Sequence, residues 1–260
     1  MKISRQEIIK LHHQYERTEL EEYGYQRIVT DHTIRQIADS PQGSFISAFN
    51  VPEDHLDLII ENEIDAFKQL GKGFEWKVYS YDNPSNIGAR LIHHGLREDD
   101  NESFMVLDLN THIDCVSMGH SSTLIPVRDA SGVRKAIDVQ RQIWPQTFDE
   151  FENSLCQRLE QSPETISMYL VQDSGQTVAS GWITYQPNSP FAGLWGGSTL
   201  PGYRSRGHYR NLLAARAWEA RERGVRYLTI DASEMSHPIV ESLGFEKISD
   251  TRGYRYEILC

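Results

Sequence analysis

Two stretches of this chain show the same order of features 149 residues apart, and this repetition constrains the fold more than any other property. At that offset Pro52 coincides with Pro201, Asp82 with Asp231, and Gly95 with Gly244. Around these positions the expected order is a strand, a helix, a strand, a short helix and a final strand in both stretches. The pattern predicts an α/β (α+β) fold, a mixed central sheet flanked by helices, with an N-terminal partial copy of the same unit. Chance resemblance between two α/β segments is the alternative.

Hydrophobic spacing and the positions of Gly and Pro predict the individual elements. Helices are expected at residues 4–22, 53–70, 85–94, 130–144, 147–161, 208–223 and 236–243. Strands are expected at 26–29, 44–50, 74–81, 103–109, 124–127, 166–171, 178–185, 191–200, 226–231 and 247–258, the last around a turn at Arg252-Gly253. Residues 110–122 are weakly patterned and read as a linker between an N-terminal domain, residues 1–120, and a C-terminal domain, residues 121–260.

The composition excludes several classes of protein. With 260 residues and 39% hydrophobic residues, the chain is neither low-complexity nor wholly disordered. It has no apolar run of about 18 residues and no apolar leader at its start, so a cytoplasmic protein without membrane association is expected. Its three cysteines are far apart in the sequence and favour free thiols over a disulfide frame or a zinc site, and no metal is expected.

The charge is distributed unevenly. Residues 203–226 hold seven arginines and two acidic residues, a net charge of +5, which leaves −16 for the rest of a chain whose total is −11. An acidic body repels nucleic acid, so a nucleic-acid binder is not expected. A small basic segment on such a body indicates one local anionic ligand, with a solvated basic helix as the alternative.

The basic segment includes a loop between an expected strand and an expected helix. The loop reads Leu200-Pro201-Gly202-Tyr203-Arg204-Ser205-Arg206-Gly207-His208-Tyr209-Arg210. A turn at a helix N-terminus exposes unpaired backbone N–H groups at the positive end of the helix dipole. Gly207 lets the backbone approach a ligand closely, since glycine has no Cβ. The loop therefore predicts a site for a phosphate or pyrophosphate.

This loop resembles the R/Q-x-x-G-x-G/A loop of the GNAT acyltransferase superfamily, which holds the pyrophosphate of acetyl-CoA. Gly244-Phe245, after a short expected helix, is similar to the C-terminal Gly-Phe of that family. The resemblance covers roughly residues 122–260 and implies a GNAT fold with acetyl-CoA as co-substrate. It implies that a backbone N–H near Ser198–Leu200 receives the thioester carbonyl. The implied cofactor-binding residues are Thr199, Leu200, Arg204, Ser205, Arg206, Gly207, His208, Tyr209 and Arg210.

The first copy lacks this loop. Opposite Arg204–Tyr209, at the same offset, stands His55-Leu56-Asp57-Leu58-Ile59-Ile60, with no glycine, no arginine and an aspartate where a phosphate would lie. The N-terminal half is therefore expected to be a degenerate GNAT-like unit in a tandem protein with one working site. An unrelated α/β cap is the alternative.

The catalytic residues that the resemblance implies are missing. The family's usual tyrosine acid corresponds to Val240, and the strand 191–200 contains no acidic residue that could act as base. Asp231, at the end of a strand, is the first substitute for the base, with a helix cap or a buried hydrogen-bond partner as the alternative. Ser198 is the second catalytic candidate, for orienting substrate or water. Tyr209 replaces a small residue, and its ring either packs against CoA or supplies the missing hydroxyl, with plain helix packing as the alternative.

Other polar side chains are assigned no chemical role. His208 and His237 are expected at the surface, and the pairs His12-His13 and His93-His94 lack the spacing of metal ligands.

The leading hypothesis is an acetyl-CoA-dependent N-acetyltransferase that acts on a small amine by direct attack in a ternary complex. The acidic body favours a cationic acceptor. A CoA-binding sensor or interaction protein without turnover is the alternative, because the usual acid and base are absent. The acceptor and the oligomeric state stay open, a homodimer being one option.

Overall fold

The computed structural model describes residues 3–112 and 123–258. Within these ranges the chain packs as two compact units. Unit 1 comprises residues 3–105, 231–241 and 247–258, and unit 2 comprises residues 106–112, 123–230 and 242–246. Most of the expected linker, residues 113–122, lies outside the described residues, so the domain boundary at residue 120 stays a prediction.

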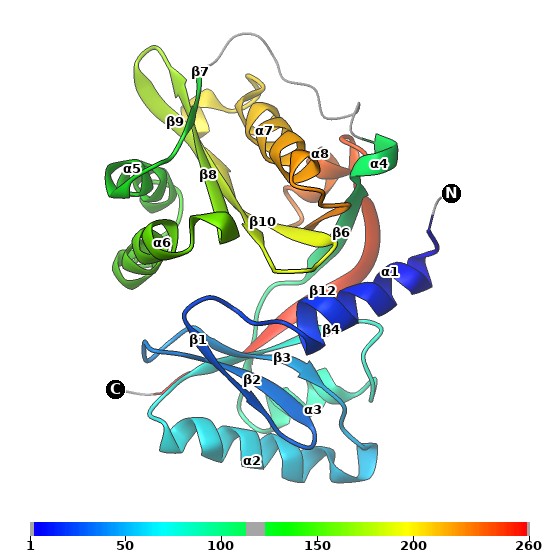
Figure 1. The fold of residues 1–260 in the computed structure, drawn as a ribbon. Helices are drawn as coiled ribbons and strands as arrows, with labels where there is room; N and C mark the ends of the chain where they lie inside the picture. Colours follow the sequence, from blue (N-terminus) through cyan, green and yellow to red (C-terminus); the bar gives the residue numbers. More distant parts are fainter. Residues whose placement is uncertain (1–2, 113–122, 259–260) are drawn as a thin grey trace. The chain divides into compact units, whose positions relative to one another are not determined.

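Unit 1 is a sheet covered by helices on both faces (Figure 1). Its helices are α1 (Arg5–His12), the π-helix η1 (His13–Thr18), the short η2 (Glu53–His55), α2 (Leu56–Gln69), α3 (Ile87–His93) and α8 (His237–Glu241). Its strands are β1 (Tyr25–Val29), β2 (Thr33–Ala38), β3 (Ser44–Phe49), β4 (Phe74–Tyr79), β5 (Arg97–Glu98) and most of β12 (Glu246–Tyr256), while β6 (Glu102–Asp108) crosses the boundary into unit 2. The strand order is β1-β2-β3-β4-β12, with β5 also paired to β12. Among the pairs β1–β2, β2–β3, β3–β4 and β4–β12 of the described residues, β3–β4 is parallel and the others are antiparallel.

The core of unit 1 joins α2 and α3 to β3 and β4. It contains the apolar face of α2 predicted from its spacing, together with the aromatic residues of β4: Leu56, Ile59, Ile60, Ile64, Phe67, Phe74 and Trp76. The last strand of the chain belongs to this unit, because residues 251–256 of β12 pair with residues 74–79 of β4.

Two sequence expectations in this unit are wrong. The sequence analysis does not predict strand β2, because its apolar residues Ile34 and Ile37 do not alternate regularly with polar ones. The strand is buried on both faces, which removes the period-2 signal. The turn expected at Arg252-Gly253 is absent, since both residues lie inside β12. A Cβ on Gly253 would stand 3.0 Å from Asp99 Oδ2 and 3.1 Å from Glu75 Cδ, so space rather than a turn explains this glycine.

A buried histidine in unit 1 makes stability depend on pH. His12 is 5% exposed, and burial, reinforced by Arg17, holds its pKa well below the ordinary value. The unfolded chain therefore takes up a proton near pH 6.5 that the folded chain refuses, so stability is present above this pH and is lost as the pH falls below it. We expect wild type to lose about 1.4 kcal/mol more than His12→Phe between pH 8 and pH 5.5, measured as free energy of unfolding. Equal pH dependence of the two proteins would show that His12 is not the group responsible.

Unit 2 is built on five strands. They are β7 (Thr123–Pro126), β8 (Ile166–Asp173), β9 (Gln176–Tyr185), β10 (Phe191–Thr199) and β11 (Tyr227–Ala232), whose last two residues belong to unit 1. Neighbouring strands are antiparallel except for the parallel pair β10 and β11. The helices are α4 (Leu109–His112), α5 (Ala130–Arg141), α6 (Asp149–Gln161), the short η4 (Pro163–Thr165), the short η5 (Pro201–Tyr203) and α7 (His208–Glu222).

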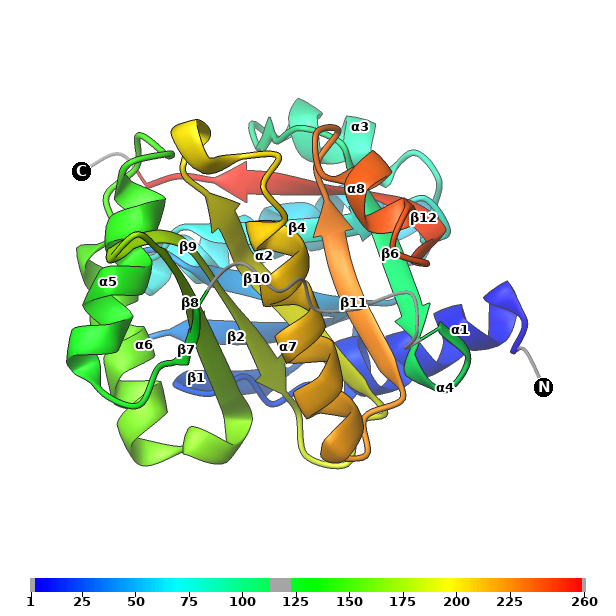
Figure 2. The same cartoon turned by 90° about the horizontal axis from the view of Figure 1, so that it is seen from above.

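The helices of unit 2 cover its sheet on both sides. Helices α5 and α6 lie on one side, where Val133, Ile137, Leu155, Met168 and Trp182 form a core, and α7 packs along β8, β9 and β10 on the other (Figures 1 and 2). In the described residues no helix has the length and apolar character that a membrane span requires.

The element order of the first half recurs in the second, as the offset predicts. Apart from the two-residue β5 between α3 and β6, the order β3, η2, α2, β4, α3, β6 is matched by β10, η5, α7, β11, α8, β12. The two copies share this order of elements but differ in their loops and side chains.

Candidate functional site

The loop before α7 has an unusual backbone. Ser205 has φ +62° and Gly207 has φ +85°, so two residues two positions apart lie in the left-handed region. Gly207 is also the N-cap of α7, and no side chain caps this end of the helix. A serine in this region is uncommon and carries a conformational cost of order 1 kcal/mol, which suggests that the loop shape serves a ligand.

The loop presents several free backbone donors. Residues 204–205 form a hydrogen-bonded turn that uses the N–H of Arg206, but within the described residues no hydrogen bond is found for the N–H groups of residues 205 and 207–210. The first loop-to-helix bond is that from Asn211 N–H to Gly207 O, 3.0 Å. A Cβ built on Gly207 would meet no atom within 4 Å, so the space over the amides is open. Successive free amides at the positive end of a helix can bind an anion, so the geometry suits the phosphate site expected from the sequence, which stays a prediction.

Three arginines surround these amides. Arg204 Nε donates to Thr199 O at 3.2 Å, and an Arg206 terminal nitrogen donates to Gly202 O at 3.1 Å. Arg210 is exposed and makes no polar contact within the described part of the chain. Cations at the N-terminus of a helix are repelled by its dipole. A bound anion would reverse that unfavourable interaction.

His208 is buried, so its expected surface position is wrong. It is 3% exposed, because it packs beside Tyr203 and its Nε2 stands 3.3 Å from Asp173 Oδ2. Asp173 also lies 3.5 Å from Arg206. The buried imidazole lies beside the end of β8, and neither of its ring nitrogens has a hydrogen-bond partner among the described residues, so its backbone N–H is the group that can face a ligand.

Tyr209 connects the loop to strand β10. A Cβ built on Gly197 would stand 2.9 Å from Tyr209 Cε2, so the ring rests directly on this glycine. Burial raises the pKa of Tyr209, which keeps its hydroxyl protonated, and within the described residues the hydroxyl has no hydrogen-bond partner. The side chain therefore offers an unpaired, protonated hydroxyl beside β10.

Strand β10 has a β-bulge at its two adjacent glycines, Gly196 and Gly197. Residues 192–195 pair with 185–182 of β9, and Ser198 and Thr199 pair with Ser180 and Ala179, so Gly196 and Gly197 face Gly181 alone. Gly196 has φ +57°, and a Cβ there would lie 1.9 Å from the Trp182 ring. No other residue type fits this position.

Strand β10 also separates from β11. The two strands pair only through residues 191–193 and 227–229. Beyond them, Leu200 N–H donates to Val178 O of β9 at 2.9 Å. Because backbone groups alternate along a strand, the N–H of Thr199 points away from β9. Of the three residues predicted to receive a carbonyl, Thr199 is thus the one with a suitably directed donor, and its buried Oγ1 also lacks a partner among the described residues.

Ser198 is held by a side chain that the sequence analysis does not single out. Its Oγ donates to Gln140 Oε1 at 3.0 Å, while Gln140 Nε2 donates to Gly196 O at 2.8 Å and to Ser180 Oγ at 2.9 Å. Gln140 is 3% exposed and grips the bulge at both ends. The signal that could have found Gln140 is its place on the apolar face of α5. That place does not show which groups its amide binds. Ser198 therefore helps to fix the strand, and its predicted role toward substrate stays a prediction.

Asp231 lies in unit 1, whereas the loop and the bulge lie in unit 2. Its Oδ2 accepts from Lys77 Nζ at 2.6 Å, and its Oδ1 is buried without a partner in the described residues. Lys77 also stands 3.9 Å from Glu102. Burial, opposed by Lys77 and reinforced by Asp231, raises the pKa of Glu102 to about 7. The role of Asp231 as base stays a prediction, and Glu102 is a carboxyl near it that exchanges protons at neutral pH.

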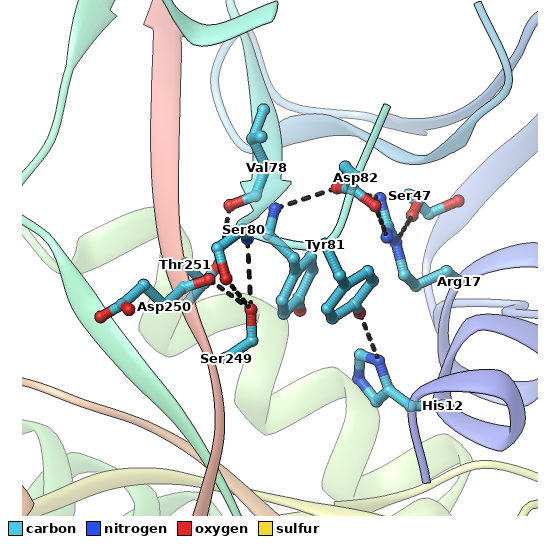
Figure 3. A network of polar contacts seen from close by, with 11 residues as sticks. His12, Arg17, Ser47, Val78, Ser80, Tyr81, Asp82, Ser249, Asp250 and Thr251 are labelled. Atoms are coloured by element: carbon cyan, nitrogen blue, oxygen red, sulfur yellow. Dashed lines mark hydrogen bonds and ion pairs between the residues drawn. The ribbon is translucent and has the colours of Figure 1, made fainter. Parts of the chain in front are cut away.

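The same strand separation exists in unit 1, but an arginine fills it. Strands β3 and β4 pair only through residues 44–46 and 74–76. Arg17, on η1, donates from Nε to Ser47 O at 3.0 Å and from its two terminal nitrogens to Asp82 at 2.6 and 3.1 Å (Figure 3). Its guanidinium also lies 5.4 Å from the centre of the Phe49 ring and 4.8 Å from that of Tyr79, so it spans both strands. We refer to Arg17 and Asp82 as the unit 1 plug.

The described residues contain no group of three or more His, Cys, Asp or Glu side chains arranged to hold a metal ion.

Comparisons with known proteins find likeness in structure but not in sequence. No family model and no curated protein matches the chain. A GCN5-related N-acetyltransferase from Kribbella flavida matches with a TM-score of 0.73 and 14% identity, over 100% of this chain and 97% of that one. One from Sphaerobacter thermophilus has a TM-score of 0.64 and 15% identity, over 98% and 86%. A tandem GNAT protein from the clavulanic acid biosynthesis pathway has a TM-score of 0.60 and 12% identity, over 92% and 85%.

Proposed function

We propose that this chain, whose fold is that of the GCN5-related N-acetyltransferases, transfers the acetyl group of acetyl-CoA to a small amine. The observation that carries the proposal is the set of unpaired N–H groups at residues 205 and 207–210, over which Gly207 leaves open space. The loop suits a diphosphate, because it combines free amides, a helix N-terminus and three arginines.

The residues of β10 suit the thioester end of acetyl-CoA. The separation from β11 leaves the N–H of Thr199 free to bind the thioester carbonyl, and the bulge fixes the direction of this N–H. A donor held in place before the reaction stabilises the charge that develops on the carbonyl oxygen, a contribution of a few kcal/mol. Gln140 keeps the bulge rigid, so little reorganisation is needed.

The reaction exchanges one bond to the acyl carbon. The amine nitrogen forms a bond to this carbon, the carbon–sulfur bond breaks, and the amine loses one proton while the thiolate gains one. Tyr209 is the residue we assign to the thiolate, because its hydroxyl is protonated and has no other partner within the described residues. This assignment replaces the family's usual tyrosine, whose position is occupied by Val240, a fully buried apolar residue.

The acceptor is proposed to be a small cationic amine. Outside residues 203–226 the chain carries a net charge of −16, which attracts cations over a distance of about 10 Å at moderate salt. This argument selects a class of acceptor and no individual compound.

The test is the release of free thiol from acetyl-CoA in the presence of polyamines, amino sugars and basic amino acids. Thiol release that depends on one of these amines, and that yields the acetylated amine by mass spectrometry, supports the proposal. Calorimetric binding of coenzyme A without thiol release for any amine supports the second candidate, a CoA-binding sensor, which the absence of an acidic residue on strand 191–200 favours. No heat with millimolar coenzyme A would refute both.

A further inference from the structure

One buried charge in unit 2 has no role in the site as described so far. Arg216, on α7, is 1% exposed, and none of the described carboxylates lies within ion-pair distance of it. A buried arginine costs several kcal/mol unless its donors are satisfied and its charge is compensated. A residue kept at such a cost calls for an explanation in the structure around it.

The donors of Arg216 bind the strands at the start of the bulge. Its Nε donates to Leu212 O at 3.0 Å within its own helix, and one terminal nitrogen donates to Trp182 O at 3.1 Å and to Trp195 O at 3.2 Å. Trp182 and Trp195 face each other across β9 and β10 as the last pair before the bulge. The guanidinium therefore fastens the two strands at the point where their register shifts.

The sequence provides the space for this contact. A Cβ on Gly181 would stand 3.0 Å from the same terminal nitrogen of Arg216, and a Cβ on Gly197 would stand 3.4 Å from the other. The guanidinium is thus packed against Gly181 and Gly197, which are the two sides of the bulge. Both glycines admit a cation behind the strand that we propose binds the thioester.

We infer that Arg216 is a positioning residue that holds the β10 bulge in the shape that binds the acyl group. The inference rests on the proposed function, because it assigns the bulge to the thioester and the 205–210 loop to the diphosphate. Since the donors of Arg216 that leave its own helix reach only the strands at the bulge, its loss should weaken recognition of the acyl group and leave binding of the CoA portion unchanged. The backbone N–H of Thr199, two residues past the bulge, is the group whose direction depends on it.

The experiment compares the affinities of acetyl-CoA and coenzyme A by calorimetry. In wild type we expect acetyl-CoA to bind about fivefold more tightly, the effect of one carbonyl hydrogen bond. Arg216→Met should remove most of this preference while the dissociation constant for coenzyme A changes less than about twofold. Arg216→Lys should restore part of the preference, because an ammonium can reach one of the two carbonyls. Gly181→Ala should reduce the preference with the arginine still present, since its Cβ displaces the guanidinium.

Arg158 provides the matched control. It is also a buried arginine of unit 2, 7% exposed, and it binds Thr165 on η4. Arg158→Met is expected to lower the melting temperature without changing the preference for acetyl-CoA. If Arg216→Met does not fold, Arg216→Lys and Gly181→Ala carry the test.

The outcomes separate the inference from the function it rests on. A folded Arg216→Met that keeps the wild-type preference overturns the inference and leaves the proposed function intact, and so does one that loses coenzyme A binding altogether. A wild type that binds both compounds equally also overturns the inference alone. A wild type that binds neither overturns the proposed function and the inference with it.

Discussion

Replacing Gly207 with valine is expected to weaken binding of coenzyme A by about 100-fold. The side chain would project into the open space over the free amides of residues 205 and 207–210, where no atom lies within 4 Å of a Cβ. A bound diphosphate must occupy this space to reach those amides, so valine would hold it out of hydrogen-bonding range. Loss of two or three charge-assisted hydrogen bonds accounts for a change of this size.

The control for this prediction lies at the other end of the same helix. Gly224 follows α7, has φ +82° against +85° for Gly207, and also has no atom within 4 Å of a built Cβ. Valine imposes the same backbone strain at both positions, of order 1–2 kcal/mol, and should lower stability equally. Calorimetry should show a large loss of affinity for Gly207→Val and none for Gly224→Val. Equal affinities in the two variants would show that the loop does not hold the diphosphate.

The loop could be predicted from the sequence because its chemistry is local. Glycine at a helix start, neighbouring arginines and a preceding strand are all readable within eleven residues, and two adjacent glycines indicate the bulge. Gln140 and Arg216 could not be found in this way, since each acts on β10 from a helix distant in the sequence. A polar residue in a helix looks the same in a sequence whether it faces solvent or grips a buried strand.

The grouping of elements into units was also beyond the sequence. The offset of 149 residues predicts the order of elements correctly, but strand pairing is a long-range property. The last strand, β12, pairs with β4 of the first half, and Asp231 pairs with Lys77. Neither contact leaves a mark in the local pattern of hydrophobic residues.

Replacing Arg17 of the unit 1 plug with methionine is expected to destabilise the protein by about 3–5 kcal/mol. Arg17 is 2% exposed, and it satisfies both oxygens of Asp82, whose side chain is 7% exposed. Methionine would leave this carboxylate buried without its cation, and it would leave Ser47 O without its donor. The penalty for an unpaired buried charge exceeds the gain from an apolar side chain of similar length. Chemical denaturation measures the difference in free energy of unfolding.

A double-mutant cycle identifies the source of this loss. Arg17→Met combined with Asp82→Asn removes both charges, and the amide oxygen introduced at position 82 can still accept the Tyr79 N–H that Asp82 binds at 2.9 Å in wild type. The double variant should be at least about 2 kcal/mol more stable than the sum of the two single losses predicts. Arg97→Met serves as the exposed control: its ion pair with Glu257 has side chains 64% and 60% exposed, so no measurable change is expected. Additive losses at positions 17 and 82 would contradict the plug as a coupled pair.

The unit 1 plug also bears on how many molecules of acetyl-CoA one chain can bind. In unit 1 the separation between β3 and β4 holds the Arg17 guanidinium. The start of α2 has Asp57 at the position that corresponds to Arg206 of unit 2, and Asp57 already binds Arg90 and His94. Both differences from unit 2 oppose the binding of the anionic acetyl-CoA. Arg17 fills the strand separation, and Asp57 places a carboxylate at the helix start. Calorimetry should therefore find one coenzyme A per chain in wild type and no second molecule in Arg17→Met, since removing the plug leaves Asp57 in place. A second binding event in either protein would show that the first half retains a donor site.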